Sequence, residues 1–176
     1  MQDDQETREK ITFAPIGTIH SPYTDPAGMP IQPAGAVGVR GRIVIDPEYQ
    51  AGLSDMEGFS RVILLYHFHC SGGYSLSVIP FLDTKPHGVF ATRAPKRPNA
   101  IWLSIVRLVA VNGNELVIED VDILDGTPLL DIKPYVPAFD CFPDGKAGWF
   151  DGCCDTVDTA RSDRRFCEKN RGGAEE

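Results

Sequence analysis

The dipeptide Asn112-Gly113 stands between two runs of strand-forming residues, IWLSIVRLVAV at 101–111 and ELVIEDVDIL at 115–124. Both runs are rich in β-branched and apolar side chains, which favour extended backbone. Asn-Gly is among the pairs most typical of a tight turn between two paired strands. The sequence therefore predicts an antiparallel hairpin here, and with it a fold built on a sheet.

Further runs of the same kind follow one another at short intervals. They span residues 11–22, 37–46, 61–69, 75–81, 88–92 and 129–135. In 37–46 the apolar residues alternate with Arg40 and Arg42, which is typical of a strand with one buried face. Six to eight short strands with few helical segments predict a mainly β fold, a single compact β-barrel with short helical segments. Closure into a barrel removes the exposed edges of an open sheet.

The strand runs define one domain with polar or irregular ends. Residues 1–10 are polar and are predicted to form a disordered lead-in. The barrel domain is expected to span residues 11–150. Residues 151–176 are predicted to form an irregular C-terminal tail, in which Asp155 or Asp158 is a possible start for a short helix.

The composition is typical of an ordinary globular protein with a net charge of −8. No apolar run is long enough to cross a bilayer, and MQDDQETREK does not resemble a signal peptide. A cytoplasmic location without membrane contact is expected, with free thiols at the five cysteines. A metal site built from Cys141, Cys153, Cys154 and Cys167 is an alternative, but their spacing departs from known ligand sets, so no metal is predicted.

One segment is cationic although the chain is acidic. From residue 85 to residue 107 no Asp or Glu occurs, and the basic residues are Lys85, Arg93, Lys96, Arg97 and Arg107. Pro95 and Pro98 stiffen the backbone, so Arg93, Lys96 and Arg97 are expected to be held outwards at defined angles. Such cations suit carboxylate or phosphate groups. A solvated basic loop without a ligand is the alternative.

Three other segments place polar residues among apolar ones. They are MPIQPAG around residues 30–32, LLYHFHC with His67 and His69 on one face, and the DGTP sequence at 125–128. Each has a structural interpretation: a plain loop, histidines bonded to backbone rather than to a metal, and a tight turn closed by the Asp125 side chain. No GxGxxG or GxxxxGK[ST] motif occurs, which argues against Rossmann and P-loop nucleotide sites.

Five segments carry a family resemblance when they are taken together. In chain order they are PIGTIHSP, PIQPAG, GFSRVILLYHFH, GVFATRAPKRPN and LDGTPLLDIKPY. With them the chain resembles the TsaA-like family, also called the TrmO family, from about Phe13 to about Phe142. The chain differs from the family's usual RPNPIGLS at Ala100 and Trp102 and from its GFSH at Arg61. The second, C-terminal domain of longer members, which helps to hold tRNA, is not expected.

The resemblance implies a β-barrel that binds S-adenosylmethionine, usually as a homodimer with the cofactor near the interface. It also implies N6-methylation of N6-threonylcarbamoyladenosine beside the anticodon of tRNA. The family's cofactor contacts correspond in this chain to Pro30, Ile31, Gln32, His69, Cys70, Arg93, Leu103, Asp125, Gly126, Thr127 and Pro128.

The chemistry of such a reaction suggests roles for further residues. Methyl transfer depends on the alignment of nitrogen, methyl group and sulfur, and a base helps to remove the N6 proton. Candidates for this base are His69, Asp125 and Tyr66, between which the sequence does not choose. Residues expected to bind the threonyl carboxylate and the RNA phosphates are Lys96, Arg97 and Lys133.

Two alternatives to this function stay open. The first keeps the cofactor but methylates another RNA site or a small molecule, and Trp102 and the missing second domain favour it. The second is a barrel that binds RNA or a small ligand without catalysis. Methyl incorporation from a labelled cofactor would separate the two.

Overall fold

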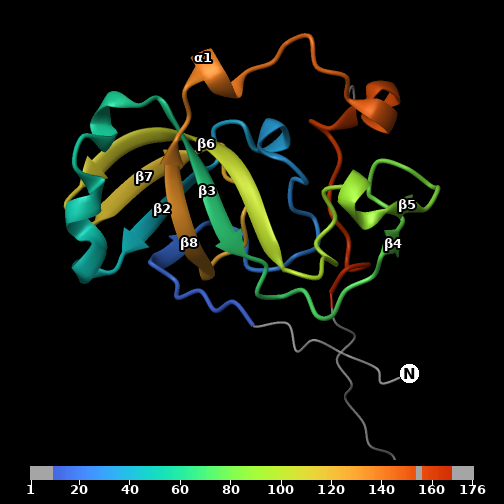
Figure 1. Cartoon of the computed structure of the whole chain (residues 1–176), viewed down its shortest axis with the longest axis horizontal. Coiled ribbons are helices and arrows are strands. Elements are labelled where there is room, and N and C mark those ends of the chain that lie inside the picture. Colours follow the sequence, from blue (N-terminus) through green and yellow to red (C-terminus); the bar gives the residue numbers. More distant parts are fainter. Residues whose placement is uncertain (1–9, 154–155, 168–176) are drawn as a thin grey trace, which may run out of the picture.

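Six strands close into an antiparallel barrel in the computed structural model, which describes residues 10–153 and 156–167 (Figure 1). In sheet order the strands are β1 (Gly17–His20), β2 (Arg40–Ile45), β7 (Glu115–Glu119), β6 (Ile101–Asn112), β3 (Arg61–His67) and β8 (Thr127–Pro134). The pairing of β8 with β1 closes the ring. The predicted mainly β barrel is confirmed.

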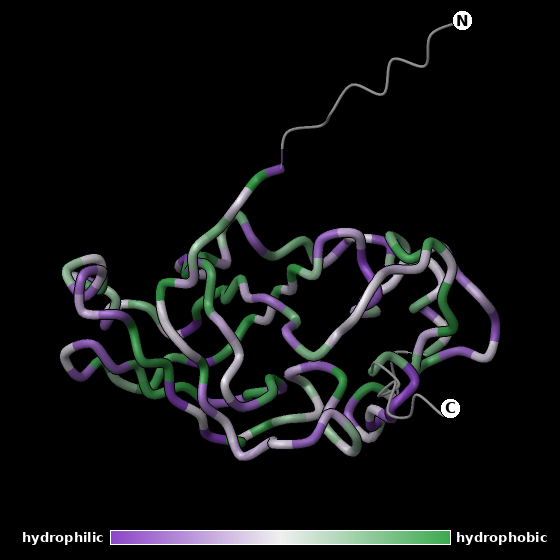
Figure 2. The backbone as a smooth tube through the Cα atoms, turned by 90° about the horizontal axis from the view of Figure 1, so that it is seen from below, coloured by the Kyte–Doolittle hydropathy of each residue, from purple (hydrophilic) through white to green (hydrophobic). Residues whose placement is uncertain are grey.

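Alternation of side chains along the strands builds the core. On β3, Val62, Leu64 and Tyr66 point inwards and are buried, as are Ile43 and Ile45 on β2. Figure 2 shows hydrophobic and hydrophilic stretches interspersed along the backbone. Because successive side chains of a strand point to opposite faces, every second apolar residue enters the barrel.

The hairpin predicted at Asn112-Gly113 is present, with a shift of one residue in its turn. Asn112 pairs with Glu115, so the two central residues are Gly113 and Asn114. Gly113 has a φ of 65°, which fits a turn with glycine in its first central position. β7 ends before the predicted residue 124, because Asp120 has a φ of 67° and leaves the extended conformation.

The first predicted strand is shorter than its sequence run. β1 begins at Gly17 instead of residue 11, and Ile11 and Phe13 are exposed. Pro15 interrupts the run, because proline has no N–H group for a strand ladder. Gly17 itself lies against β2, where an added Cβ would come within 2.3 Å of the Val44 carbonyl oxygen.

The chain between β3 and β6 forms a lobe beside the barrel (Figure 1). The runs 75–81 and 88–92 were predicted as strands of the sheet. They supply only β4 (Ser77–Val78) and β5 (His87–Gly88), which pair with each other. Prolines follow β4 and precede β5, and they keep both strands too short to enter the barrel.

The predicted short helical segments connect these elements. They are η1 (Pro33–Ala36), η2 (Pro47–Leu53), η3 (Met56–Gly58), η4 (Val89–Ala91), α1 (Pro137–Asp140) and η5 (Gly148–Gly152). All but α1 are 3₁₀ turns. No helix in the described part of the chain is long and apolar enough to cross a membrane.

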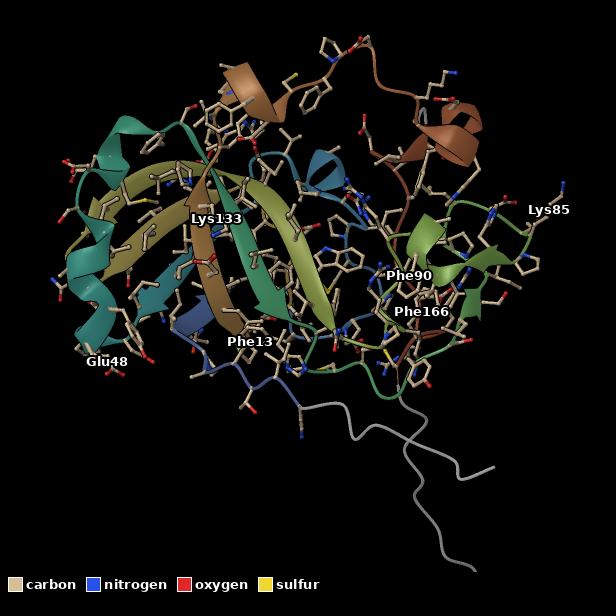
Figure 3. All side chains as sticks on the ribbon, in the orientation of Figure 1. Phe13, Glu48, Lys85, Phe90, Lys133 and Phe166 are labelled. Atoms are coloured by element: carbon tan, nitrogen blue, oxygen red, sulfur yellow. The ribbon has the colours of Figure 1, made fainter. Side chains whose placement is uncertain are left out.

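The C-terminal tail is irregular, as predicted, but it packs onto the rest of the protein. The possible short helix stays a prediction, because Asp155, like the lead-in residues 1–9, lies outside the described residues; Thr156 next to it belongs to a 3₁₀ turn, and no helix element begins at Asp158. Phe166 completes a second small core whose other members are Val78, Val89, Ala94 and Phe81. Figure 3 shows Phe166 on the side of the molecule where the lobe lies. These tail contacts join residues that are almost ninety positions apart in the sequence.

Candidate functional site

A cavity of about 570 Å³ lies between one end of the barrel, the lobe and the tail. Tyr66 of β3 and Trp102 of β6 line it from the barrel, Arg93 from the lobe and Phe166 from the tail. The lining is mostly apolar and aromatic, with a few polar side chains. Cavities of this size and character commonly hold small molecules or cofactors.

Seven of the eleven positions that the resemblance assigned to the cofactor line this cavity. They are Pro30, Ile31, Gln32, His69, Cys70, Arg93 and Thr127. They come from the loop before η1, the chain after β3, the lobe and the start of β8. The fold therefore gathers four segments that are distant in sequence around one space.

Direct contacts connect these segments across the cavity. Arg93 Nη1 donates a hydrogen bond to Gln32 Oε1 at 2.5 Å. His69 Nδ1 lies 3.4 Å from Thr127 Oγ1, whose hydroxyl donates to the carbonyl oxygen of Leu124 at 2.7 Å. The Arg93 segment and the DGTP turn therefore border the same cavity within one subunit.

The other four assigned positions do not line the cavity. They are Leu103, Asp125, Gly126 and Pro128. Leu103 is 43% exposed and belongs to the outward-facing positions of β6. Asp125 Oδ1 accepts a hydrogen bond from the Ser21 backbone N–H at 3.1 Å and lies 3.1 Å from His20 Nδ1. The Asp125 side chain therefore ties the DGTP turn to the chain at the end of β1, a contact that its structural interpretation as the closure of a local turn did not anticipate.

Two cations of the basic segment do not point outwards as predicted. Arg97 Nη1 donates to the carbonyl oxygens of Val89 at 2.9 Å and Thr92 at 3.0 Å. Lys96 Nζ donates to the carbonyl oxygen of Gly72. Both side chains satisfy backbone carbonyls of the lobe, so the prediction that they are held outwards is wrong.

The remaining cations lie in different places. Lys85 is exposed at the tip of the lobe, whereas Lys133 lies on β8 of the barrel (Figure 3). Lys133 forms an ion pair with Asp131 at 2.7 Å, and Arg107 forms one with Glu119 at 2.5 Å. Within the predicted basic segment, all of which the structure describes, Arg93 is the cation that lines the cavity.

The three candidate bases differ in their surroundings. Burial raises the pKa of Tyr66 well above its ordinary value, so the phenol keeps its proton. The hydrogen bond from the Ser21 N–H lowers the pKa of Asp125, which makes it a weaker base. Burial, together with repulsion from His67, lowers the pKa of His69, so its imidazole is neutral near pH 7.

Sequence reasoning did not identify Asp122, although it lines the cavity next to a predicted candidate. Ser104 Oγ donates to Asp122 Oδ1 at 2.8 Å and lies 2.9 Å from the Tyr66 hydroxyl, which therefore donates to Ser104. Burial raises the pKa of Asp122 to about 6, and the Ser104 hydrogen bond partly opposes this. The available signal was an acidic residue between the apolar Val121 and Ile123, both of which are buried.

No group of three or more His, Cys, Asp or Glu side chains in the described part of the chain is placed to hold a metal ion. Cys70, Cys141 and Cys167 are free thiols. Cys154 lies outside the described residues. The cysteine-rich end of the sequence therefore offers no metal site within the structure described.

Comparison with known proteins gives this arrangement a family. Residues 18–141 match the family model of the tRNA-methyltransferase O (TrmO) N-terminal domain. The chain belongs to this family. A probable S-adenosyl-L-methionine-binding protein of Pyrococcus abyssi is 51% identical over 160 residues, which cover 91% of this chain and 87% of that protein.

Two other members of the TrmO family extend the comparison. The human tRNA (adenine(37)-N6)-methyltransferase is 37% identical over 135 residues, 72% of this chain and 30% of that enzyme. A crystal structure of TrmO from Pseudomonas aeruginosa superposes with a TM-score of 0.68 at 37% identity, over 80% of this chain and 63% of that one. This chain thus spans less than two thirds of either protein.

In this TrmO-family chain the tail beyond the matched domain closes one side of the cavity. Ser162 Oγ donates to the carbonyl oxygen of Pro26 at 2.5 Å and accepts from the Met29 N–H at 3.1 Å. Trp149 Nε1 donates to the Ala91 carbonyl oxygen at 2.7 Å. No role was predicted for Trp149 or Ser162 from the sequence, because both side chains bind backbone groups, and the backbone is the same at every position of a sequence.

Proposed function

We propose that the protein is an S-adenosylmethionine-dependent methyltransferase that acts on N6 of adenosine in tRNA, with N6-threonylcarbamoyladenosine beside the anticodon as its substrate. One observation carries this proposal: Arg93 and Thr127, from two characteristic TrmO segments, border one apolar cavity. The names of the relatives, which include a cofactor-binding protein and a tRNA methyltransferase, support it. A cytoplasmic location remains part of the proposal.

The cavity lining suits the parts of this cofactor. Arg93 offers a guanidinium group for the methionine carboxylate. Phe68 and Trp102 meet edge to face with ring centroids 4.7 Å apart, and such rings attract adenine and a sulfonium cation. When it is bound, S-adenosylmethionine supplies an electrophilic methyl group.

The protein itself would contribute to such a reaction by holding the acceptor and the cofactor in position and by excluding water. The barrel, lobe and tail enclose the cavity from three sides, so a bound acceptor and cofactor would have few orientations open to them. Holding nitrogen, methyl group and sulfur in line lowers the barrier by removing the entropy cost of alignment. His69, neutral near pH 7, can hold or accept a proton at the entrance beside Thr127.

A homodimer is the second part of the proposal. The outer faces of β3 and β6 carry Leu65 opposite Leu103 and Ile63 opposite Ile105. These residues, with the exposed Ile101, make an apolar strip on the outside of the barrel. A second copy packed on this strip would bury Leu103, the position at which the resemblance implies a cofactor contact.

Methylation of another RNA site or of a small molecule is a second candidate. It is favoured by the positions of Lys96 and Arg97, which bind backbone carbonyls and so are not available for phosphates in this conformation. Trp102 also occupies part of the cavity wall where the family usually has glycine. A smaller acceptor would need fewer cations and less space.

The deciding experiment incubates the purified chain with isotopically labelled S-adenosylmethionine and tRNA from cells that lack their own N6-methyltransferase. Nucleoside mass spectrometry is expected to find the label on N6-threonylcarbamoyladenosine. Label on another nucleoside would instead support the second candidate. Calorimetry that shows no binding of S-adenosylmethionine up to millimolar concentration would remove the cofactor, and with it the proposed function.

A further inference from the structure

Asp122 is a buried carboxylate on the cavity wall that has no ion pair with any described residue. Asp120, two positions earlier, is also buried but lies 3.3 Å from the Arg61 guanidinium and accepts the Gly38 N–H at 3.0 Å. Asp122 instead accepts a hydrogen bond from Ser104, and Arg93 attracts it only through space. A buried charge without a cationic partner costs folding free energy, and such groups concentrate at functional sites.

We propose that Asp122 is the proton acceptor of the methyl transfer: its carboxylate takes the N6 proton of the acceptor adenosine inside the cavity. This inference rests on the proposed function and assigns the base for it. Of the three candidates drawn from the sequence, Tyr66 keeps its proton and Asp125 faces Ser21 outside the cavity, and the His69→Gln variant described below separates Asp122 from His69.

The proposed step is balanced in atoms and charge. The N6–H bond breaks, and its proton forms an O–H bond with Asp122. The nitrogen electron pair forms the new bond to the methyl carbon, while the pair of the breaking carbon–sulfur bond stays on sulfur. One sulfonium and one carboxylate become a neutral thioether and a neutral carboxylic acid. A poorly hydrated cavity favours a reaction that removes a pair of opposite charges.

The groups that face Asp122 come from four parts of the fold. Tyr66 from β3 and Ser104 from β6 form the hydrogen-bonded chain, Arg93 approaches from the lobe, and Tyr23 comes from the loop after β1. Tyr66 and Tyr23 are neutral at pH 7, because proximity to Asp122 and burial raise the pKa of each phenol. Arg93 and Ser104 favour the carboxylate, so Asp122 is ionised above pH 6 and able to accept a proton.

The test is the single-turnover methylation rate of wild type and Asp122→Asn, measured from pH 5 to pH 8. Below about pH 6 the wild-type rate is expected to fall about tenfold per pH unit, which forms the acidic limb of the profile. Above this pH the rate should level off. Asp122→Asn is expected to lose about 100-fold or more of the plateau rate and to show no such limb. Asparagine keeps the shape of the side chain and can still accept the Ser104 hydrogen bond.

Two controls separate a base from a structural role. Asp120→Asn removes a buried carboxylate two positions away and is expected to keep the limb, because Asp120 faces Arg61 and not the cavity. Ser104→Ala removes the hydrogen bond that lowers the pKa of Asp122 and should move the limb to higher pH. His69→Gln should keep a limb at the wild-type pH whatever its effect on cofactor affinity.

Calorimetry with S-adenosylmethionine and S-adenosylhomocysteine completes the test. A proton acceptor predicts that Asp122→Asn binds both compounds with wild-type affinity, which also shows that the variant folds. Selective loss of affinity for the sulfonium compound would overturn the assignment and make Asp122 the partner of the cofactor's charge. A variant that keeps the limb and most of its rate would overturn it as well. If wild type methylates nothing, the proposed function itself fails, and that outcome is distinguishable from a failure of Asp122 alone.

Discussion

Arg93 is the residue at which the sequence and the structure agree most directly. It lines the cavity, and its hydrogen bond to Gln32 holds the guanidinium at the boundary between the lobe and the loop before η1. The neighbouring Arg97 binds backbone carbonyls instead. Two arginines four positions apart thus have different roles, because Arg97 reaches the carbonyl oxygens of Val89 and Thr92 whereas Arg93 reaches Gln32 at the cavity.

Arg93→Ala is expected to weaken S-adenosylmethionine binding by about 1.5–3 kcal/mol, the contribution of a hydrogen bond to a charged group. Titration calorimetry measures this loss. Lys85→Ala removes a cation of the same segment at the exposed tip of the lobe and should leave the affinity unchanged. Equal affinities for Arg93→Ala and wild type would show that another group holds the methionine carboxylate.

The raised pKa of Asp122 also leads to a prediction about the stability of the fold. Its pKa rises from 3.8 to about 6 on folding, so the folded state favours the protonated form, and ionisation destabilises it as pH rises through that window. The shift corresponds to about 3 kcal/mol. The free energy of unfolding of Asp122→Asn, relative to wild type, should therefore increase by about this amount between pH 3.5 and pH 7.

Chemical denaturation at several pH values measures that difference. Because both proteins share every other titratable group, their difference isolates Asp122. A constant difference across this range would mean that Asp122 has the same pKa in the folded and the unfolded chain, and it would contradict the burial effect that sets the expected pH dependence of the reaction.

At the scale of elements, the outer faces of β3 and β6 expose apolar side chains that no contact within the described part of the chain accounts for. The strip around Leu65 and Leu103 has no covering element among the described residues, and Ile101 and Leu103 are 37% and 43% exposed. Exposed apolar strips on a soluble barrel commonly mark contact surfaces. This placement agrees with the dimer proposed above.

Leu103→Asp should convert the dimer into a monomer, because a carboxylate buried in an apolar interface lacks a partner. Light scattering coupled to size-exclusion chromatography gives the mass. Tyr49→Asp places the same charge at another partly exposed position, on η2, and should leave the mass unchanged. A wild-type chain that is monomeric at micromolar concentration would refute the proposed dimer.

For the whole molecule, the tail decides whether the cavity is closed. Phe166 is buried against Phe81, with ring centroids 5.1 Å apart, and this contact holds the tail to the lobe. The barrel core involves none of these residues. The tail and lobe should therefore open without unfolding of the barrel.

Phe166→Ala is expected to weaken cofactor binding by about tenfold, equivalent to about 1.4 kcal/mol, while the thermal transition of the barrel changes little. Calorimetry and proteolysis of the tail measure the two effects. Phe139→Ala, at an exposed position on α1, is the matched control. If Phe166→Ala binds the cofactor with wild-type affinity, the tail contacts the cavity without determining its shape.

The sequence predicted those features that depend on neighbours along the chain. Alternating apolar residues indicated the strands, Asn112-Gly113 indicated the hairpin, and the segments of the resemblance indicated seven of the residues that line the cavity. It failed where prolines shortened a strand-like run, as at residues 75–81. This error arose because local propensity does not include the partner that a segment needs in order to form.

By itself, the sequence determined that this chain forms a β-barrel, because the two-residue period of a strand is a local property of side-chain order. Only the tertiary structure decided which residues share the cavity. Tyr66, Ser104 and Asp122 meet through strand pairing and barrel closure, and Lys96 and Arg97 turn to backbone carbonyls that leave no trace in the sequence. A site of this kind is a property of distances between remote segments, and these distances exist only after the barrel has closed.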